Sequence, residues 1–210
     1  MLTEFLYGAY KTLSLAFTAW VFGLPLGIIF SFFSLRFPKY SFYLSSLSVV
    51  LTVLPFLAIL FWFHYPLQNI LDVVWSPYFT SAFLLAIFVA IISGEIVAEE
   101  MRKTKKDFID SVDVLGIRKD VFLMRVVFPT AIINALPRLL NLCVVSIHMT
   151  MFASLIGVEE LFWITLRLNS EYLQPVKIFS IMALFYACIC LPLYFLANRL
   201  SEKLNRNNHA

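Results

Sequence analysis

Five long apolar stretches constrain the fold of this chain more than any other feature of its sequence. They cover residues 12–35, 42–63, 78–97, 134–157 and 176–196. A helix of about 20 apolar residues crosses the hydrocarbon of a bilayer and satisfies every peptide group within its own segment. The sequence therefore predicts an all-α integral membrane protein with five transmembrane helices, in which residues 1–210 form a single domain.

The composition agrees with a membrane protein and offers no sign of catalysis. Hydrophobic residues make up 61% of the chain and charged residues 14%, whereas soluble domains carry about a quarter charged residues. The first apolar stretch is too long for a signal peptide and lacks a small-residue cleavage pattern, so we expect it to be retained. The sequence contains neither a G-x-x-x-x-G-K-[ST] phosphate loop nor a grouped nucleophile, base and acid. We therefore expect this chain to be no enzyme and to bind no cofactor.

The sequence also predicts the role of the cysteines and the kinds of partner that the chain has. Cys143, Cys188 and Cys190 all lie within apolar stretches, where a small apolar role is more common than a disulfide or a metal site. We therefore expect no metal site. The lipid bilayer is the expected surrounding, and nucleic acid is not an expected partner.

The positions of the basic residues predict the orientation of the chain. Arg36 and Lys39 lie in the first connection, the third connection is rich in Lys and Arg, and more of them follow the fifth stretch. The opposite side holds only Lys11, Arg167 and Lys177, the last of which lies at the start of the fifth stretch. Because Lys and Arg favour cytoplasmic connections, we expect the N-terminus outside and the C-terminus inside.

The third connection, residues 101–129, is too long and too apolar for a simple linker. Its apolar side chains recur at helical spacing: Phe108, Val112 and Leu115. Gly116 then permits a sharp turn, and a second helical run is expected near residues 119–126, before Pro129. This pattern predicts a short amphipathic docking helix on the cytoplasmic face. The alternative is an amphipathic helix that lies on lipid headgroups.

Residues 110–129 also resemble a known motif. Asp110-Ser111-Val112-Asp113-Val114-Leu115-Gly116, followed after nine residues by Val126-Val127-Phe128-Pro129, resembles the cytoplasmic loop of ABC importer permeases, written EAA, three residues, G, nine residues, I-x-L-P. Gly116 and Pro129 match this motif, whereas the other positions differ. Further segments resemble the polar amino-acid permeases in order and spacing: Gly94-Glu95-Ile96, Leu136-Pro137 and Ser154-Leu155-Ile156-Gly157-Val158-Glu159-Glu160-Leu161.

The resemblance implies a permease subunit of an ATP-driven amino-acid importer in the bacterial inner membrane, with ATP hydrolysed by partner subunits. It further implies two ATPase subunits that bind ATP and Mg, a second permease subunit (the same or a different chain), and a periplasmic or lipid-anchored binding protein. The coupling helix that contacts the ATPase would contain Asp110, Ser111, Val112, Asp113, Gly116, Ile117 and Arg118. Two alternatives stay open: a permease for methionine or another small solute, and a membrane scaffold without a transport path.

A polar stripe in the fourth apolar stretch marks the expected substrate pathway. Asn134, Arg138, Asn141 and His148 follow one face of a helix, and we expect this face to point into the bundle. The stripe either lines the pathway or supplies hydrogen bonds between helices. Residues 148–152 stand where the family often has K-D-T-S-L, and of this motif only Thr150 is retained. We therefore assign His148, Thr150, Asn141 and Glu95 to the pathway.

Two further expectations concern helix contacts. Glu95 either neutralises a cationic substrate or pairs with Arg138 at the cytoplasmic edge, and Glu99 is placed to contact Lys103 one turn later. Gly23 and Gly27 allow another helix to approach closely, whereas Pro25 between them favours a kink instead.

Overall fold

The computed structural model describes the backbone of residues 1–114 and 118–208. It describes side chains in these ranges except at residues 35, 36, 38, 105, 107–114, 119, 120 and 205–208. Every regular element in the described ranges is helical, which confirms the all-α fold class.

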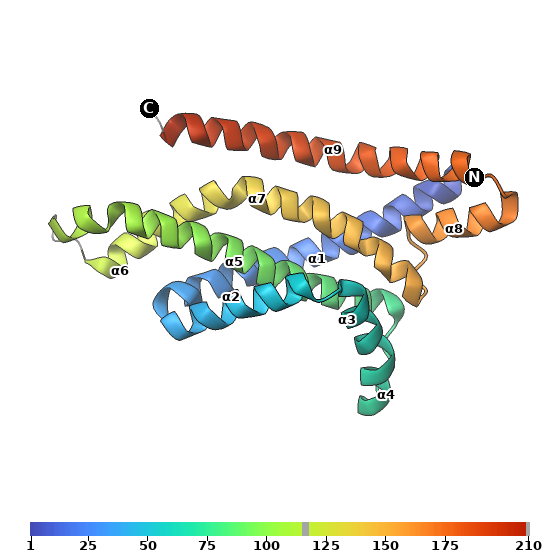
Figure 1. Ribbon diagram of the computed structural model, residues 1–210, viewed down its shortest axis with the longest axis horizontal. Helices are drawn as coiled ribbons and strands as arrows, with labels where there is room; N and C mark the ends of the chain where they lie inside the picture. Colours follow the sequence, from blue (N-terminus) through green and yellow to red (C-terminus); the bar gives the residue numbers. More distant parts are fainter. Residues whose placement is uncertain (115–117, 209–210) are drawn as a thin grey trace.

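Four long helices form an elongated bundle: α1 (Leu2–Arg36), α5 (Pro77–Val114), α7 (Phe128–Met149) and α9 (Pro175–Asn208). They lie side by side along the long axis of the molecule (Figure 1). Helix α6 (Lys119–Phe122) and a π-helical turn (Leu123–Val127) lead into α7, and a 3-10 helix (Thr150–Ile156) follows it. Four helical segments are long and apolar enough to cross a membrane: Leu2–Ser34, Pro77–Thr104, Leu123–Ile156 and Pro175–Leu204.

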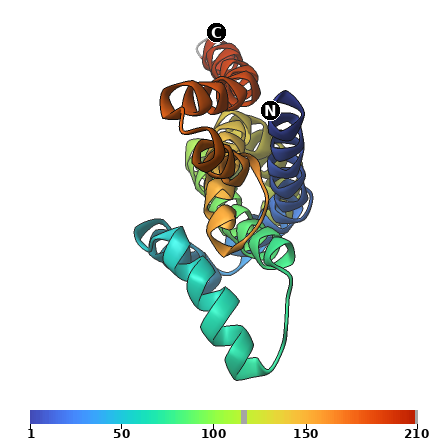
Figure 2. The same ribbon diagram turned by 90° about the vertical axis from the view of Figure 1, so that its right-hand side faces the viewer.

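The second apolar stretch is not the single straight helix expected over residues 42–63. Residues 39–53 and 56–71 together are long and apolar enough to form one broken span, so the described residues contain four or five candidate spans. The structure has α2 (Pro38–Val53) and α3 (Phe56–Trp62), with a bend of 94° between them. Pro55 explains the break, because it lacks a backbone N–H and disfavours helical angles at Leu54, which is extended. Helix α3, a π-helical turn (Phe63–Leu67) and α4 (Gln68–Leu71) form an arm that projects from the bundle (Figure 2).

Helix α5 also differs from its expected bounds. The separate short helix expected beyond residue 101 is instead the continuation of α5, which runs unbroken from Pro77 to Val114. Neither Gly nor Pro occurs between Gly94 and Val114, so no residue in this range interrupts the helix. The helical run expected near residues 119–126 is confirmed as α6 and the π-helical turn that follows it.

Helices α1 and α5 pack closely because both carry glycine at their contact. A Cβ atom on Gly23 would lie 2.7 Å from the carbonyl oxygen of Ala86, and one on Gly27 would collide with Ser93. Gly94 of α5 lies directly against Gly27. Helix α1 continues through Pro25 without interruption, so close approach is the confirmed role of the two α1 glycines.

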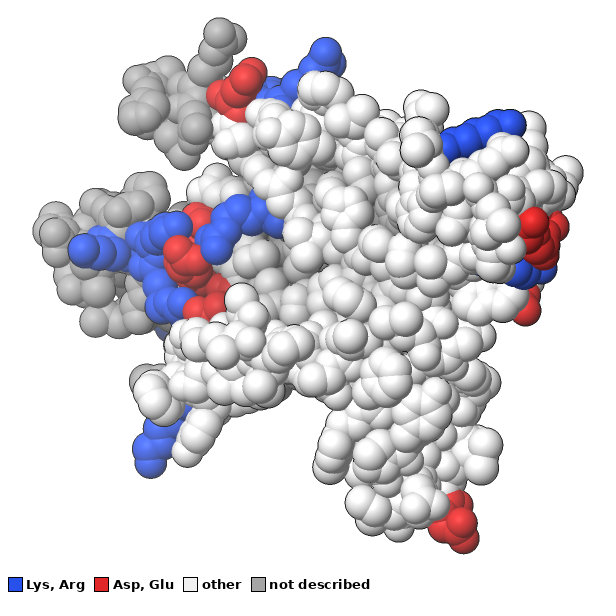
Figure 3. Space-filling model, turned by 45° about the vertical axis from the view of Figure 1, so that its right-hand side comes forward, with Lys and Arg blue, Asp and Glu red and all other residues white. Residues whose placement is uncertain are grey.

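The two ends of the bundle differ in what they hold. One end, which we call the α6 end, contains α6 and the last residues of α5 and α9; the other, the α8 end, contains the N-terminus and α8 (Leu161–Tyr172). The two termini lie at opposite ends (Figure 1). Charged side chains gather near the ends, and the face in Figure 3 has a broad uncharged middle. This distribution fits a bundle whose middle lies in hydrocarbon.

Candidate functional site: the polar face of α7 and the ion pairs beside it

The polar stripe of α7 lies on the outside of this chain. Arg138, Asn141 and His148 are exposed, and Asn134 is half-buried. The opposite face of α7 is buried by α1, α5 and α9; its residues include Ala131, Ala135, Leu142, Cys143 and Ile147. The expectation that the stripe points into the bundle is therefore wrong for this single chain, because the apolar side chains occupy the interior. We call the exposed stripe the polar face of α7.

His148 lies at the end of α7 nearest α8, against α9. Its Nε2 atom is 3.6 Å from the Sγ atom of Cys190, and its ring lies 5.8 Å from that of Tyr186. Asn141 lies two turns earlier on the same face, since seven residues complete almost two turns of a helix. The structure thus places two of the expected pathway residues on one exposed surface.

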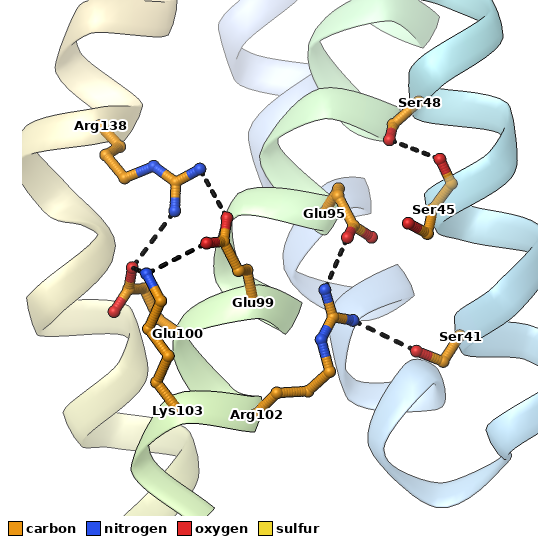
Figure 4. A network of polar contacts seen from close by, with 9 residues as sticks. All are labelled: Ser41, Ser45, Ser48, Glu95, Glu99, Glu100, Arg102, Lys103 and Arg138. Carbon is orange, nitrogen blue, oxygen red and sulfur yellow. Dashed lines mark hydrogen bonds and ion pairs between the residues drawn. The ribbon is translucent and has the colours of Figure 1, made fainter.

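The other two expected pathway residues lie elsewhere. Thr150 is buried, and its hydroxyl donates to the carbonyl oxygen of Ile147 at 2.7 Å. Glu95 lies midway along α5 and points toward α2 (Figure 4). The structure therefore does not join all four residues into one cavity.

Glu95 pairs with a residue of its own helix. Its Oε1 atom lies 2.6 Å from Nη2 of Arg102, whose Nη1 donates to the hydroxyl of Ser41 on α2 at 3.2 Å. The expected pair between Glu95 and Arg138 is wrong. Arg102 follows Glu95 by two turns and shares its side of α5, whereas Arg138 approaches α5 from α7.

Arg138 instead contacts the two neighbouring carboxylates of α5. Its Nη2 lies 2.7 Å from Oε2 of Glu99, and its Nη1 lies 3.2 Å from Oε1 of Glu100. Lys103 lies 3.0 Å from both carboxylates, which confirms the expected contact with Glu99 (Figure 4). Glu100 is only 14% exposed, so the network is partly shielded from water.

The expected coupling residues lie at the α6 end. Four of them belong to the last turns of α5, and their side chains lie outside the described residues: Asp110, Ser111, Val112 and Asp113. All atoms of Gly116 and Ile117 lie outside the described residues. Arg118 is exposed, and its carbonyl oxygen accepts the N–H of Phe122 at 3.1 Å. Buried Phe122 and Val127 attach this segment to the core formed by α5 and α7.

Glu160 is a buried polar residue whose role the sequence did not predict. Its Oε1 accepts the backbone N–H of Trp163 at 2.9 Å and so caps α8, while its Oε2 accepts the hydroxyls of Thr12 and Tyr186. Thr12 also accepts the N–H of Leu161 at 3.1 Å. Glu160 thus ties α8 to α1 and α9. The only signals in the sequence are its position directly before an amphipathic run and its place in the segment 154–161.

A large groove lies between α1, α2 and α5 and does not fit a polar solute. Its volume is about 640 Å³, and its lining is almost entirely apolar, with side chains such as Phe22, Leu47 and Phe83. Hydroxyl groups occur near its α8 end, where Ser14 and Tyr78 share a hydrogen bond of 2.8 Å. Sites for polar ligands need convergent polar groups, so the polar face of α7 is the better candidate.

Three comparisons relate this chain to known proteins. Residues 23–206 match the family described as "Binding-protein-dependent transport system inner membrane component". The nopaline transport system permease protein NocM of Agrobacterium fabrum is 27% identical over 114 residues, which cover 54% of this chain and 47% of NocM. The chain thus matches about half the length of this relative.

Two solved structures share the fold. A crystal structure of an amino acid ABC transporter with histidines superposes with a TM-score of 0.84 at 22% identity. The match covers 96% of this chain and 94% of the transporter chain. The methionine ABC transporter MetNI, in inward-facing conformations, gives a TM-score of 0.72 at 14% identity, with 97% of both chains covered.

The family match extends over most of the chain, and it agrees with the long apolar helices and with the fold of the two transporters. This chain belongs to the family of binding-protein-dependent transport system inner membrane components and is a permease subunit of an ABC importer.

Proposed function

We propose that this permease subunit imports amino acids and forms the translocation pathway together with a second permease subunit, either the same chain or a different one. The observation that carries this proposal is the polar face of α7. Arg138, Asn141 and His148 are exposed on a helix of apolar composition. Polar and ionisable side chains in a span face a protein interior or a water-filled cavity. A second subunit across a shared pathway supplies that surrounding.

The charge distribution supports an orientation with the α6 end in the cytoplasm of a bacterium and the chain in its inner membrane. The connection between α5 and α7 is rich in Lys and Arg, and basic residues favour cytoplasmic connections. In this orientation residues 110–118 meet one of the two ATPase subunits, which bind ATP and Mg. A periplasmic or lipid-anchored binding protein then delivers the solute at the α8 end.

The relatives support an amino-acid substrate. NocM is described as a nopaline transport permease, and one structural neighbour as an amino acid transporter with histidines. The neighbour MetNI transports methionine, which makes a methionine permease the second candidate. His148 is an exposed ionisable side chain of the polar face, in a position to meet a polar solute there.

Reconstitution of the complete transporter in liposomes tests this function. The permease, its ATPase and its binding protein are assembled, and ATP-driven uptake is measured for a panel of amino acids that includes methionine. We expect uptake of a polar amino acid, with a large loss in Asn141→Leu and His148→Phe. Phe22→Leu, at an exposed position of α1, serves as a matched control with normal uptake.

The outcomes separate the candidates. Preferential uptake of methionine would favour the second candidate. Assembly with the ATPase but no uptake of any solute would contradict a transport function and favour a scaffold. Gly116→Pro tests the coupling segment in the same preparation: we expect loss of the copurified ATPase, and unchanged assembly with unchanged uptake would contradict this contact.

A further inference from the structure

We propose that Arg138 is a positioning residue that transmits movement of α5 to the polar face of α7. This inference rests on the proposed function, in which the last turns of α5 contact the ATPase. It adds a specific link between that contact and the pathway, and it assigns the link to one side chain.

Helix α5 is suited to carry movement along its length. It is one helix from Pro77 to Val114, with neither Gly nor Pro after Gly94. Glu99 and Glu100 lie about 20 Å before its last residue, at a rise of about 1.5 Å per residue. A displacement at the end of such a helix reaches these carboxylates, because nothing between them interrupts the backbone hydrogen bonds.

Arg138 connects these carboxylates to α7. The guanidinium group spreads over two side chains, with Nη2 at 2.7 Å from Glu99 and Nη1 at 3.2 Å from Glu100. Two charge-assisted contacts from one rigid planar group fix orientation as well as distance. The apolar contacts between α5 and α7 hold the helices together, whereas this pair of contacts also fixes the rotation of α7 about its axis.

Because Arg138 lies on the polar face of α7, a rotation of α7 that it controls also moves the other residues of that face. Arg138 precedes Asn141 by three residues and His148 by ten, and all three side chains are exposed on the same face. Lys103 holds the same two carboxylates but belongs to α5, so it transmits nothing between helices. Among the described side chains of this network, Arg138 is the one that α7 contributes (Figure 4).

The second ion pair of α5 supplies a matched control. Arg102 contacts Glu95 at 2.6 Å and Ser41 of α2 at 3.2 Å. Its side chain is 43% exposed, close to the 44% of Arg138. Arg102 therefore has the same guanidinium group, nearly the same exposure and a position close to Arg138, but it contacts α2 instead of α7 (Figure 4).

The experiment compares Arg138→Gln with Arg102→Gln in the complete reconstituted transporter. ATP hydrolysis and solute uptake are measured together, and uptake per ATP hydrolysed is the readout. We expect Arg138→Gln to assemble and hydrolyse ATP while uptake per ATP falls by roughly fivefold or more. Arg102→Gln should keep the wild-type ratio. The charge exchange Arg138→Glu with Glu99→Arg should recover much of the loss, because it restores a pair between the same helices.

Several results would overturn the inference while leaving the proposed function intact. One is wild-type uptake per ATP in Arg138→Gln. A second is an equal loss in both single variants, and a third is an uncoupled Arg138→Gln that the charge exchange does not rescue. Failure of Arg138→Gln to assemble, with normal assembly of Arg102→Gln, would assign a structural role to the pair and overturn the inference as well. A wild-type complex without uptake would instead contradict the proposed function.

Discussion

At the scale of single residues, Glu160 combines burial with a full set of hydrogen bonds. It lies between the candidate spans at the α8 end, and burial raises the pKa of its carboxyl group from 4.5 to about 7. Hydrogen bonds from the backbone of Phe162 and Trp163 and from the hydroxyls of Thr12 and Tyr186 oppose this rise in pKa. The native structure therefore holds the proton more tightly than an unfolded chain does.

This pKa predicts a pH-dependent stability. The contribution of Glu160 is fully present below pH 4.5 and is lost as the pH rises through 7, a change of roughly 3 kcal/mol. We expect the thermal unfolding temperature of the purified permease to fall between pH 5 and pH 8, and to fall much less in Glu160→Gln. Glu159→Gln, an exposed neighbour, should behave like the wild type. Equal pH dependence in all three proteins would contradict the buried-carboxyl account.

The sequence predicted the types of charged contacts better than their partners. Glu99 and Lys103 are four residues apart on one helix, so their contact follows from helix geometry alone. The partner of Arg138 depends on how α7 rotates against α5, and the interior packing of Ala131, Ala135 and Leu139 sets that rotation. The spacing of residues within one helix does not determine how the neighbouring helix is rotated about its own axis.

At the scale of helices, the contact between α1 and α5 depends on the absence of side chains at Gly27 and Gly94. Gly27→Leu would force side-chain atoms into Ser93 and the carbonyl of Ala90. We expect a loss of stability of about 1–3 kcal/mol or more, because extra methylenes in a packed interface displace backbone. Thermal unfolding in detergent measures this loss. Phe22→Leu, on the exposed side of α1, is the control, and equal stability of both variants would contradict the close contact.

Four of the five apolar stretches correspond to long helices, because length and hydropathy alone decide whether a segment can span a bilayer. The stretches did not predict the bend at Pro55, since proline inside a membrane helix is often tolerated and α1 continues through Pro25. Helix α8 was missed for a different reason. It is short, and its buried positions Leu161, Ile164 and Leu168 are meaningful only once α1 and α9 are in place.

At the scale of the whole molecule, the orientation of the chain is a testable consequence of its charges. In cells, Glu159→Cys at the α8 end should react with a membrane-impermeant maleimide added outside. Lys106→Cys near the α6 end should react only after the membrane is permeabilised. Both positions are exposed, so burial does not limit either reaction. The reverse pattern would contradict the orientation that the basic residues favour.

The polar face of α7 has surroundings that lie beyond this single chain. The sequence correctly identified a polar stripe in the fourth apolar stretch, but the stripe lies outside the interior of this chain. A pattern of polar residues predicts a protected surrounding and does not say which molecule provides it. In the proposed complex, the second permease subunit and the pathway provide it.

The reactivity of a cysteine at position 141 tests this central claim most directly. In a variant with its native cysteines replaced, Asn141→Cys is compared with Leu184→Cys, an exposed apolar position of α9, within the assembled transporter. A small water-soluble thiol reagent should modify Asn141→Cys, and transported solute should slow that reaction, while Leu184→Cys stays unmodified. An unreactive Asn141→Cys, or equal reactivity at both positions without protection by solute, would contradict a pathway along the polar face of α7.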